Sequence, residues 1–122
     1  MTKILYIEDN DDNIYMLKMR LERKGHEVLI ARDGLAGYHA AVENKPDIIL
    51  LDVGLPVLDG YQTAQKLKAD DSVKKIPVIM LTAHALSEDR DRALNSGADE
   101  YEAKPVNLAA LLQKIEALTR SK

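Results

Sequence analysis

Residues 47–52 read Asp47-Ile48-Ile49-Leu50-Leu51-Asp52, an unbroken apolar run between two aspartates. A strand with one face in water would alternate apolar and polar residues. A continuous apolar run is typical of a strand covered on both faces, as in a parallel sheet with helices on each side. The segments 4–7 (Ile-Leu-Tyr-Ile) and 78–81 (Val-Ile-Met-Leu) share this pattern. Together the three runs predict the interior of a parallel sheet.

The rest of the chain alternates strand-like and helical segments. The predicted strands are Lys3–Glu8, Val28–Ala31, Asp47–Asp52, Pro77–Thr82 and Asp99–Ala103. The predicted helices are Asn10–Lys24, Asp33–Asn44, Asp59–Ala69, Ser87–Ser96 and Asn107–Thr119. Strict alternation favours right-handed crossovers and a doubly wound α/β domain. We therefore predict a three-layer (βα)5 sandwich with a parallel five-stranded sheet in the flavodoxin-like order 2-1-3-4-5.

Composition limits what this domain can be. The chain has 122 residues, of which 46% are apolar, which suits one hydrophobic core. We expect a single domain over residues 1–122 with no output domain, because residues 120–122 resemble a frayed tail. A net charge of −3 disfavours a nucleic-acid surface, and no apolar stretch is long enough to span a membrane. Cysteine is absent, which excludes disulfides and thiolate chemistry. These features predict a cytoplasmic protein that binds neither nucleic acid nor membrane.

Polar residues gather where the predicted strands end. Glu8 and Asp9 follow the first strand, Asp52 ends the third, Thr82 ends the fourth, and Lys104 follows the fifth. The carboxyl ends of parallel strands meet at one edge, so these side chains should converge. Clustered carboxylates repel one another and raise one another's pKa unless a hard cation such as Mg²⁺ lies among them. A carboxylate can also attack phosphorus to give an aspartyl-phosphate.

Each residue taken alone has an ordinary structural explanation. The acids at 8–12 could be those enriched in the first turn of a helix. Asp52 could simply close a buried strand, and strands favour threonine at positions such as Thr82. Lys104-Pro105 could be a turn. A functional site is predicted because all of these residues are expected at the same edge of the sheet.

Four segments in order resemble the response-regulator receiver family, over nearly the whole chain. They are Ile7-Glu8-Asp9-Asn10, then residues 50–60 (Leu-Leu-Asp-Val-Gly-Leu-Pro-Val-Leu-Asp-Gly), then Leu81-Thr82-Ala83, then residues 101–105 (Tyr-Glu-Ala-Lys-Pro). The likeness is to stand-alone receivers of the DivK and CheY type. It implies a phosphorelay switch in which Asp52 accepts a phosphoryl group from a histidine kinase or histidine phosphotransfer protein. Such a switch modifies itself and does not turn over external substrates.

The resemblance also implies roles for the other residues. Mg²⁺ would be held by Glu8, Asp9, Asp52 and the backbone carbonyl of Gly54. Thr82 would sense the phosphoryl group, Lys104 would pair with it, and Tyr101 would turn inward when Thr82 moves. The Lys104–Pro105 peptide is expected to be cis. The surface around the fourth strand, fourth helix and fifth strand would then bind a downstream protein.

Three features leave alternatives open. Gly54 and His84 stand two residues after Asp52 and Thr82, at positions that govern access of water in this family, so the lifetime of the aspartyl-phosphate is open. Tyr101 could be a half-buried strand aromatic rather than a switch. Asn13, Met16 and Pro105 suggest a docking surface for a helical phosphodonor, although Met16 could be an isolated surface methionine.

Other functional classes fit less well. A phosphatase of the haloacid-dehalogenase type needs an acid two residues after its nucleophile, where this chain has Gly54, and a cap domain. An EF-hand at Asp9–Arg20 fails because Ile14 replaces the glycine and Arg20 replaces the final glutamate. A receiver that only binds partners, without phosphorylation, is disfavoured by the intact acidic and basic residues.

Overall fold

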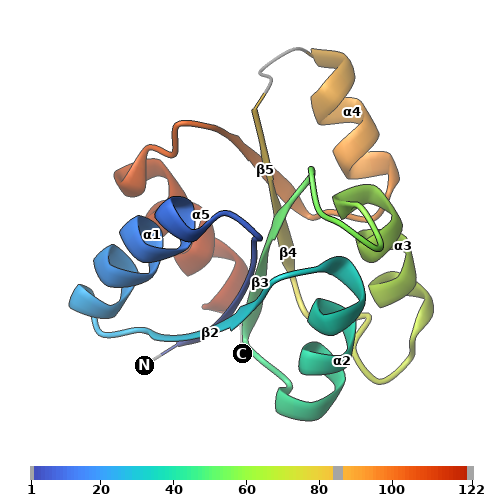
Figure 1. Cartoon of the computed structure of the whole chain (residues 1–122), viewed down its shortest axis with the longest axis horizontal. Coiled ribbons are helices and arrows are strands. Elements are labelled where there is room, and N and C mark those ends of the chain that lie inside the picture. The colour runs from blue at the N-terminus through green and yellow to red at the C-terminus, as the bar shows by residue number, and fades with distance from the viewer. Residues whose placement is uncertain (1, 84–86, 121–122) are drawn as a thin grey trace.

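The computed structural model describes residues 2–83 and 87–120 and has the predicted architecture. Five parallel strands form one sheet in the order β2-β1-β3-β4-β5. Helices α1 and α5 cover one face and α2, α3 and α4 the other (Figure 1). The strands are β1 Lys3–Ile7, β2 Glu27–Ala31, β3 Ile48–Asp52, β4 Val78–Thr82 and β5 Glu100–Ala103. The helices are α1 Asp11–Arg23, α2 Gly34–Asn44, α3 Gly60–Ala69, α4 Ser87–Asn95 and α5 Leu108–Thr119.

The continuous apolar runs are buried as predicted. All five residues of β3 and of β4 are buried, as are the last four of β1. Their side chains point alternately to the two faces and enter two separate cores. One core lies under α2, α3 and α4 and includes Leu5, Ile7, Leu51, Leu67 and Met80. The other lies under α1 and α5 and includes Tyr6, Leu17, Leu50, Leu111 and Ile115.

Helix caps account for much of the difference between predicted and observed boundaries, none of which exceeds one residue. Asn10, Asp33 and Asp59 were predicted as first helical residues, but they are N-caps, as is Asn107. Each caps its helix by accepting a hydrogen bond from a backbone N–H in the first turn. Helix α2 ends before Pro46, as predicted, and Lys45 adopts the left-handed conformation that commonly ends a helix. Within the described residues, no helix is both long and apolar enough to cross a bilayer.

The sheet register aligns the strand ends that carry polar residues. Ile7 pairs with Leu51, Asp52 with Leu81, and Thr82 with Ala103. The residues that follow these positions therefore emerge at one edge of the sheet. In that register the side chains of Glu8, Asp52 and Lys104 can meet although they are far apart in sequence.

Val57 adopts an unfavourable backbone conformation in the loop between β3 and α3. Its φ angle is +69°, in the left-handed region, and its side chain is 70% exposed. The left-handed conformation costs an L-residue about 1–2 kcal/mol, and a β-branched residue is crowded further in it. Because the Val57 side chain is mostly exposed, hydrophobic burial does little to offset this cost.

We expect Val57→Gly to raise the free energy of unfolding by about 0.5–1 kcal/mol. Glycine removes the steric cost but is more flexible in the unfolded chain, which offsets part of the gain. Val57→Ala is the matched control, because alanine still has a Cβ in the same conformation. Urea denaturation of the three proteins checks this. A glycine variant less stable than the alanine variant would show that Val57 carries no backbone strain, because only glycine's greater flexibility in the unfolded chain would then separate the two.

Candidate functional site

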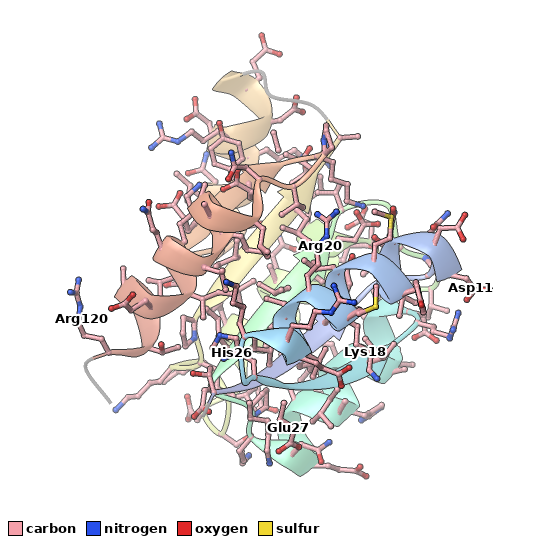
Figure 2. The ribbon with its side chains drawn as sticks, turned by 90° about the vertical axis from the view of Figure 1, so that its left-hand side faces the viewer. Asp11, Lys18, Arg20, His26, Glu27 and Arg120 are labelled. Atoms are coloured by element: carbon pink, nitrogen blue, oxygen red, sulfur yellow. The ribbon has the colours of Figure 1, made fainter. Side chains whose placement is uncertain are left out.

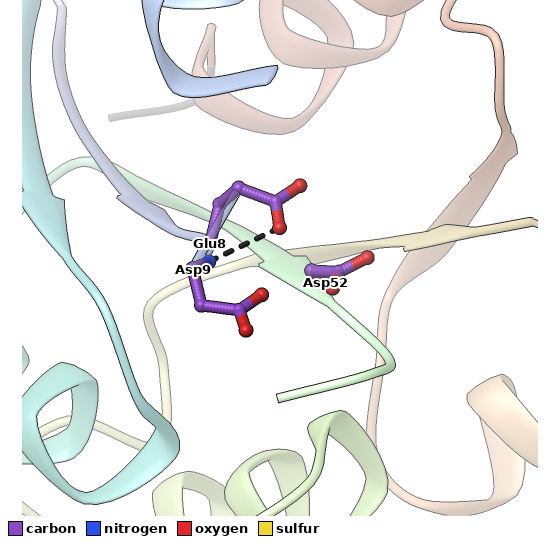
Figure 3. A group of neighbouring side chains, drawn as sticks. All are labelled: Glu8, Asp9 and Asp52. Atoms are coloured by element: carbon purple, nitrogen blue, oxygen red, sulfur yellow. Dashed lines mark hydrogen bonds between the residues drawn. The ribbon is translucent and has the colours of Figure 1, made fainter. Parts of the chain in front are cut away.

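Three carboxylates lie together at the carboxyl edge of the sheet. Glu8 and Asp9 follow β1, and Asp52 is the last residue of β3. Figure 3 shows their carboxyl groups turned toward a common space. One oxygen from each lies within 4.8 Å of the others. Glu8 and Asp52 are buried, whereas Asp9 is exposed.

Lys104 also belongs to this group, and it follows the outer strand β5. Its backbone N–H donates to the carbonyl of Thr82 at 2.7 Å, which continues the β4–β5 pairing past the end of β5. Its ammonium Nζ donates to Asp52 Oδ1 at 2.6 Å and to Glu8 Oε1 at 2.9 Å. The Lys104–Pro105 peptide bond is cis, as expected. One ammonium group therefore links β5 with the ends of β1 and β3.

Glu8 is enclosed by hydrogen-bond donors. Its side chain is 1% exposed. Besides Lys104, Oε1 accepts hydrogen bonds from the Tyr6 hydroxyl and the Asn13 amide, each at 3.3 Å. Oε2 accepts the backbone N–H groups of Asp9 at 3.1 Å and Asn10 at 3.3 Å. The buried charge is thus compensated by a cation and four neutral donors.

The two buried acids have opposite pKa shifts. Burial raises the pKa of Asp52, and the charges of Glu8 and Asp9 add to the increase, so that Lys104 only partly offsets it. Burial also acts to raise the pKa of Glu8, but the hydrogen bond and charge of Lys104, with the Asn10 and Asn13 donors, lower it overall. Desolvation likewise acts against the charge of Lys104, yet Asp52 and Glu8 raise its pKa. The expectation that the clustered carboxylates all raise one another's pKa is therefore wrong for Glu8.

The backbone passes very close to Asp52 on the α3 side. A Cβ at Gly60 would lie 2.5 Å from the Asp52 carbonyl oxygen and 2.7 Å from Val53 Cα. Glycine therefore lets the start of α3 approach the end of β3. At Gly54, which is exposed, a Cβ would lie 3.8 Å from Asp52 Oδ2. The absence of a side chain there leaves space beside the Asp52 carboxylate, which is itself buried.

The predicted switch residues lie next to the site. Thr82 is the last residue of β4 and is 3% exposed. Tyr101 is half-buried in β5, between the Arg90 guanidinium of α4 at 5.9 Å and the Lys114 ammonium of α5 at 5.7 Å from its ring centre. His84 lies outside the described residues.

The predicted docking residues line a single pocket of about 280 Å³ between α1 and the segment after β5. Met16 is 51% exposed, as expected. Arg20 also lines the pocket, and Figure 2 shows it in the view onto the layer of α1 and α5. The Asn13 amide also donates a hydrogen bond to Glu8, which was not predicted. It therefore belongs to both the pocket wall and the acidic site.

Tyr6 was missed as a site residue. It was assigned only to the apolar run of the first strand, yet its hydroxyl donates to Glu8. A signal was present, because residues two apart in a strand point to the same face. A tyrosine two positions before a buried acid can place its hydroxyl beside that acid.

Comparison with known proteins defines the class. Residues 4–116 match the sequence model of the response regulator receiver domain. The chain is 38% identical over 98% of its length to the DNA-binding dual master transcriptional regulator RpaA of Synechocystis, and covers 50% of that protein. It is 33% identical to the polar-differentiation response regulator DivK of Brucella anthropi, and 93% of each chain is covered. The chain thus spans about half of some relatives and nearly all of others.

Solved structures agree with this result. The receiver domain of a sensor histidine kinase from Pseudomonas aeruginosa, with a magnesium ion in its active-site cleft, superposes with a TM-score of 0.90. The two are 35% identical, and 97% of each chain is covered. The fold and the acidic edge define a receiver of two-component signalling. This chain belongs to the response-regulator receiver family.

We expect Glu8→Gln and Asp52→Asn to change stability in opposite directions in metal-free buffer. At pH 7, Glu8→Gln should lower the free energy of unfolding by about 1–3 kcal/mol, because it removes the charge that Lys104 and the other donors stabilise. Asp52→Asn should raise it, because the ionised Asp52 is disfavoured by burial and by like charges. Urea denaturation in a chelator measures both.

The same pair predicts a pH dependence. The stability that ionised Glu8 provides is complete above its ordinary pKa of 4.5 and is lost as pH falls through its lower folded pKa. The cost of ionised Asp52 is complete above its raised pKa and vanishes below its ordinary value of 3.8. The difference in the free energy of unfolding between each variant and the wild type should therefore become smaller at acidic pH. Changes of the same sign at pH 7 would contradict the assignment of the two shifts.

Proposed function

We propose that this chain is a phosphorelay switch that accepts a phosphoryl group on Asp52. The observation that supports this most directly is the 2.6 Å contact between Lys104 Nζ and Asp52 Oδ1 at an edge shared with two further acids. Asp52 Oδ would attack the phosphorus of a phosphohistidine on a partner. A P–O bond forms and the P–N bond breaks, and the released imidazole takes up a proton. The partner is a cytoplasmic histidine kinase or histidine phosphotransfer protein.

The donor set suits Mg²⁺. Asp9 and Asp52 offer carboxylate oxygens, Glu8 lies within reach of both, and the backbone at Gly54 passes beside Asp52. A small hard cation prefers such all-oxygen surroundings. We assign Glu8, Asp9, Asp52 and the Gly54 carbonyl to it. When bound, Mg²⁺ would neutralise charge on the phosphoryl oxygens.

The protein's own groups have complementary roles. Lys104 would move its ammonium from Asp52 to the phosphoryl group and so balance the new negative charge. The Thr82 hydroxyl, on the neighbouring strand, would donate to another phosphoryl oxygen. The exposed Gly54 leaves room for the incoming phosphohistidine.

The output would pass through Thr82, Tyr101 and helix α4. Within the described residues α4 buries Ala93 as its one fully buried apolar side chain, and its Arg90 lies over the Tyr101 ring. A helix anchored by so few apolar contacts can shift at low cost. Movement of Thr82 toward the phosphoryl group would free space for Tyr101 and present a changed surface to a downstream protein.

We expect acetyl phosphate to add one phosphoryl group to the wild-type chain in the presence of Mg²⁺, and none to Asp52→Asn. Intact mass, about 80 Da higher for one phosphoryl group, is the measurement. A chelator should abolish labelling, and Mg²⁺ should raise the melting temperature of the wild type more than that of Asp9→Asn. Labelling of Asp52→Asn at the wild-type level, or labelling indifferent to chelator, would rule out this function.

A second prediction concerns the docking pocket. Met16→Asp should slow transfer from a phosphorylated histidine phosphotransfer protein about tenfold or more, because it places a charge in an apolar contact. Labelling by acetyl phosphate should stay unchanged, since the acceptor is intact. Leu35→Asp on α2 is the matched control, being an exposed apolar side chain outside this pocket. Equal transfer rates for the two variants would place the docking surface elsewhere.

A further inference from the structure

Tyr6 is a core residue whose hydroxyl reaches the acidic site. Its side chain is 2% exposed and packs in the core under α1 and α5. The hydroxyl donates to Glu8 Oε1 at 3.3 Å. A carboxylate oxygen can only accept, so the Tyr6 hydroxyl is the donor in this contact. A phenylalanine would fill the same space without this hydroxyl.

The oxygen that Tyr6 contacts is shared with two other donors. Lys104 Nζ lies 2.9 Å from Glu8 Oε1, and Asn13 Nδ2 lies 3.3 Å from it. A carboxylate oxygen has only about two lone-pair sites. The three donors therefore compete for this oxygen, and each hydrogen bond weakens the other two.

We propose that Tyr6 is a positioning residue for Lys104: by occupying part of Glu8 Oε1, its hydroxyl limits how firmly Glu8 retains the lysine that the phosphoryl group requires. This inference rests on the proposed phosphoryl-acceptor function. Lys104 now divides its hydrogen bonds between Glu8 and Asp52. Transfer to a phosphoryl group on Asp52 requires the ammonium to reorient, and a stronger bond to Glu8 opposes that movement.

Removal of the Tyr6 hydroxyl is expected to strengthen the contact between Glu8 and Lys104. In Tyr6→Phe, Glu8 Oε1 loses a neutral donor, so its negative charge is compensated more fully by Lys104. The Glu8–Lys104 pair tightens, and the rate of phosphoryl acceptance falls. Because Glu8 is also a proposed Mg²⁺ ligand, the rates are compared at saturating Mg²⁺, where a change in metal affinity does not alter them.

The experiment measures labelling by acetyl phosphate at saturating Mg²⁺ for wild type and Tyr6→Phe. We expect a rate lower by about three- to tenfold, in keeping with the strength of one hydrogen bond to a charged group. The ¹⁵N resonance of Lys104 Nζ should move in the unphosphorylated, metal-free protein. Tyr38→Phe is the matched control, because it removes a hydroxyl whose partner is Asp70. It should alter neither readout.

A double-mutant cycle separates positioning from a loss of core packing. In a Glu8→Gln background the Glu8 carboxylate that links Tyr6 to Lys104 is gone, so adding Tyr6→Phe should change the rate by less than about twofold. A packing defect would persist in that background. If Glu8→Gln labels too slowly to measure, Asn13→Ala replaces it, because Asn13 donates to the same oxygen. It should slow labelling in the same direction, and more strongly when combined with Tyr6→Phe.

Failure of this inference is distinct from failure of the proposed function. If the wild type is not labelled at all, the acceptor function itself is wrong. If the wild type is labelled and Tyr6→Phe is labelled as fast or faster, with the Lys104 resonance unmoved, only the role of Tyr6 is overturned.

Discussion

The ammonium of Lys104, held between Glu8 and Asp52, is the interaction on which the functional edge depends. Two carboxylates with little access to water would otherwise face each other uncompensated, and unpaired buried charge is costly. Lys104 follows β5, whereas its partners end β1 and β3. One side chain therefore compensates the charge and ties the outer strand to the two at the centre. The same bridge would supply the cation that the proposed phosphoryl transfer needs.

The two carboxylates that Lys104 bridges, Glu8 and Asp52, are stabilised unequally. Glu8 has Lys104 and four neutral donors, and its pKa falls. Asp52 has Lys104 but also the charges of Glu8 and Asp9, and its pKa rises. A stabilised anion suits a permanent anchor, whereas a disfavoured one suits a nucleophile whose charge is later shared with a cation or a phosphoryl group. The division of roles follows from the surroundings, since both groups are carboxylates.

Much of this could be read from the chain before its structure. The apolar runs at β1, β3 and β4 predict strands covered on both faces, and the alternation of segments predicts the strand order. The edge that gathers Glu8, Asp52 and Lys104 then follows from parallel topology alone. Several helix starts were predicted one residue too early, because an N-cap such as Asp33 shares the polar character of a first turn while its backbone remains extended.

What the sequence by itself determined is the fold, the sheet edge and the set of charged groups on it, because periodicity and strand direction are local properties that add up along the chain. Only the tertiary structure decided which donor meets which oxygen. The Tyr6 hydroxyl on Glu8, the second contact of Asn13 and the lowered pKa of Glu8 all depend on distances of about 3 Å between side chains. Such distances are set by packing across separate strands and helices, and residue order does not encode them directly.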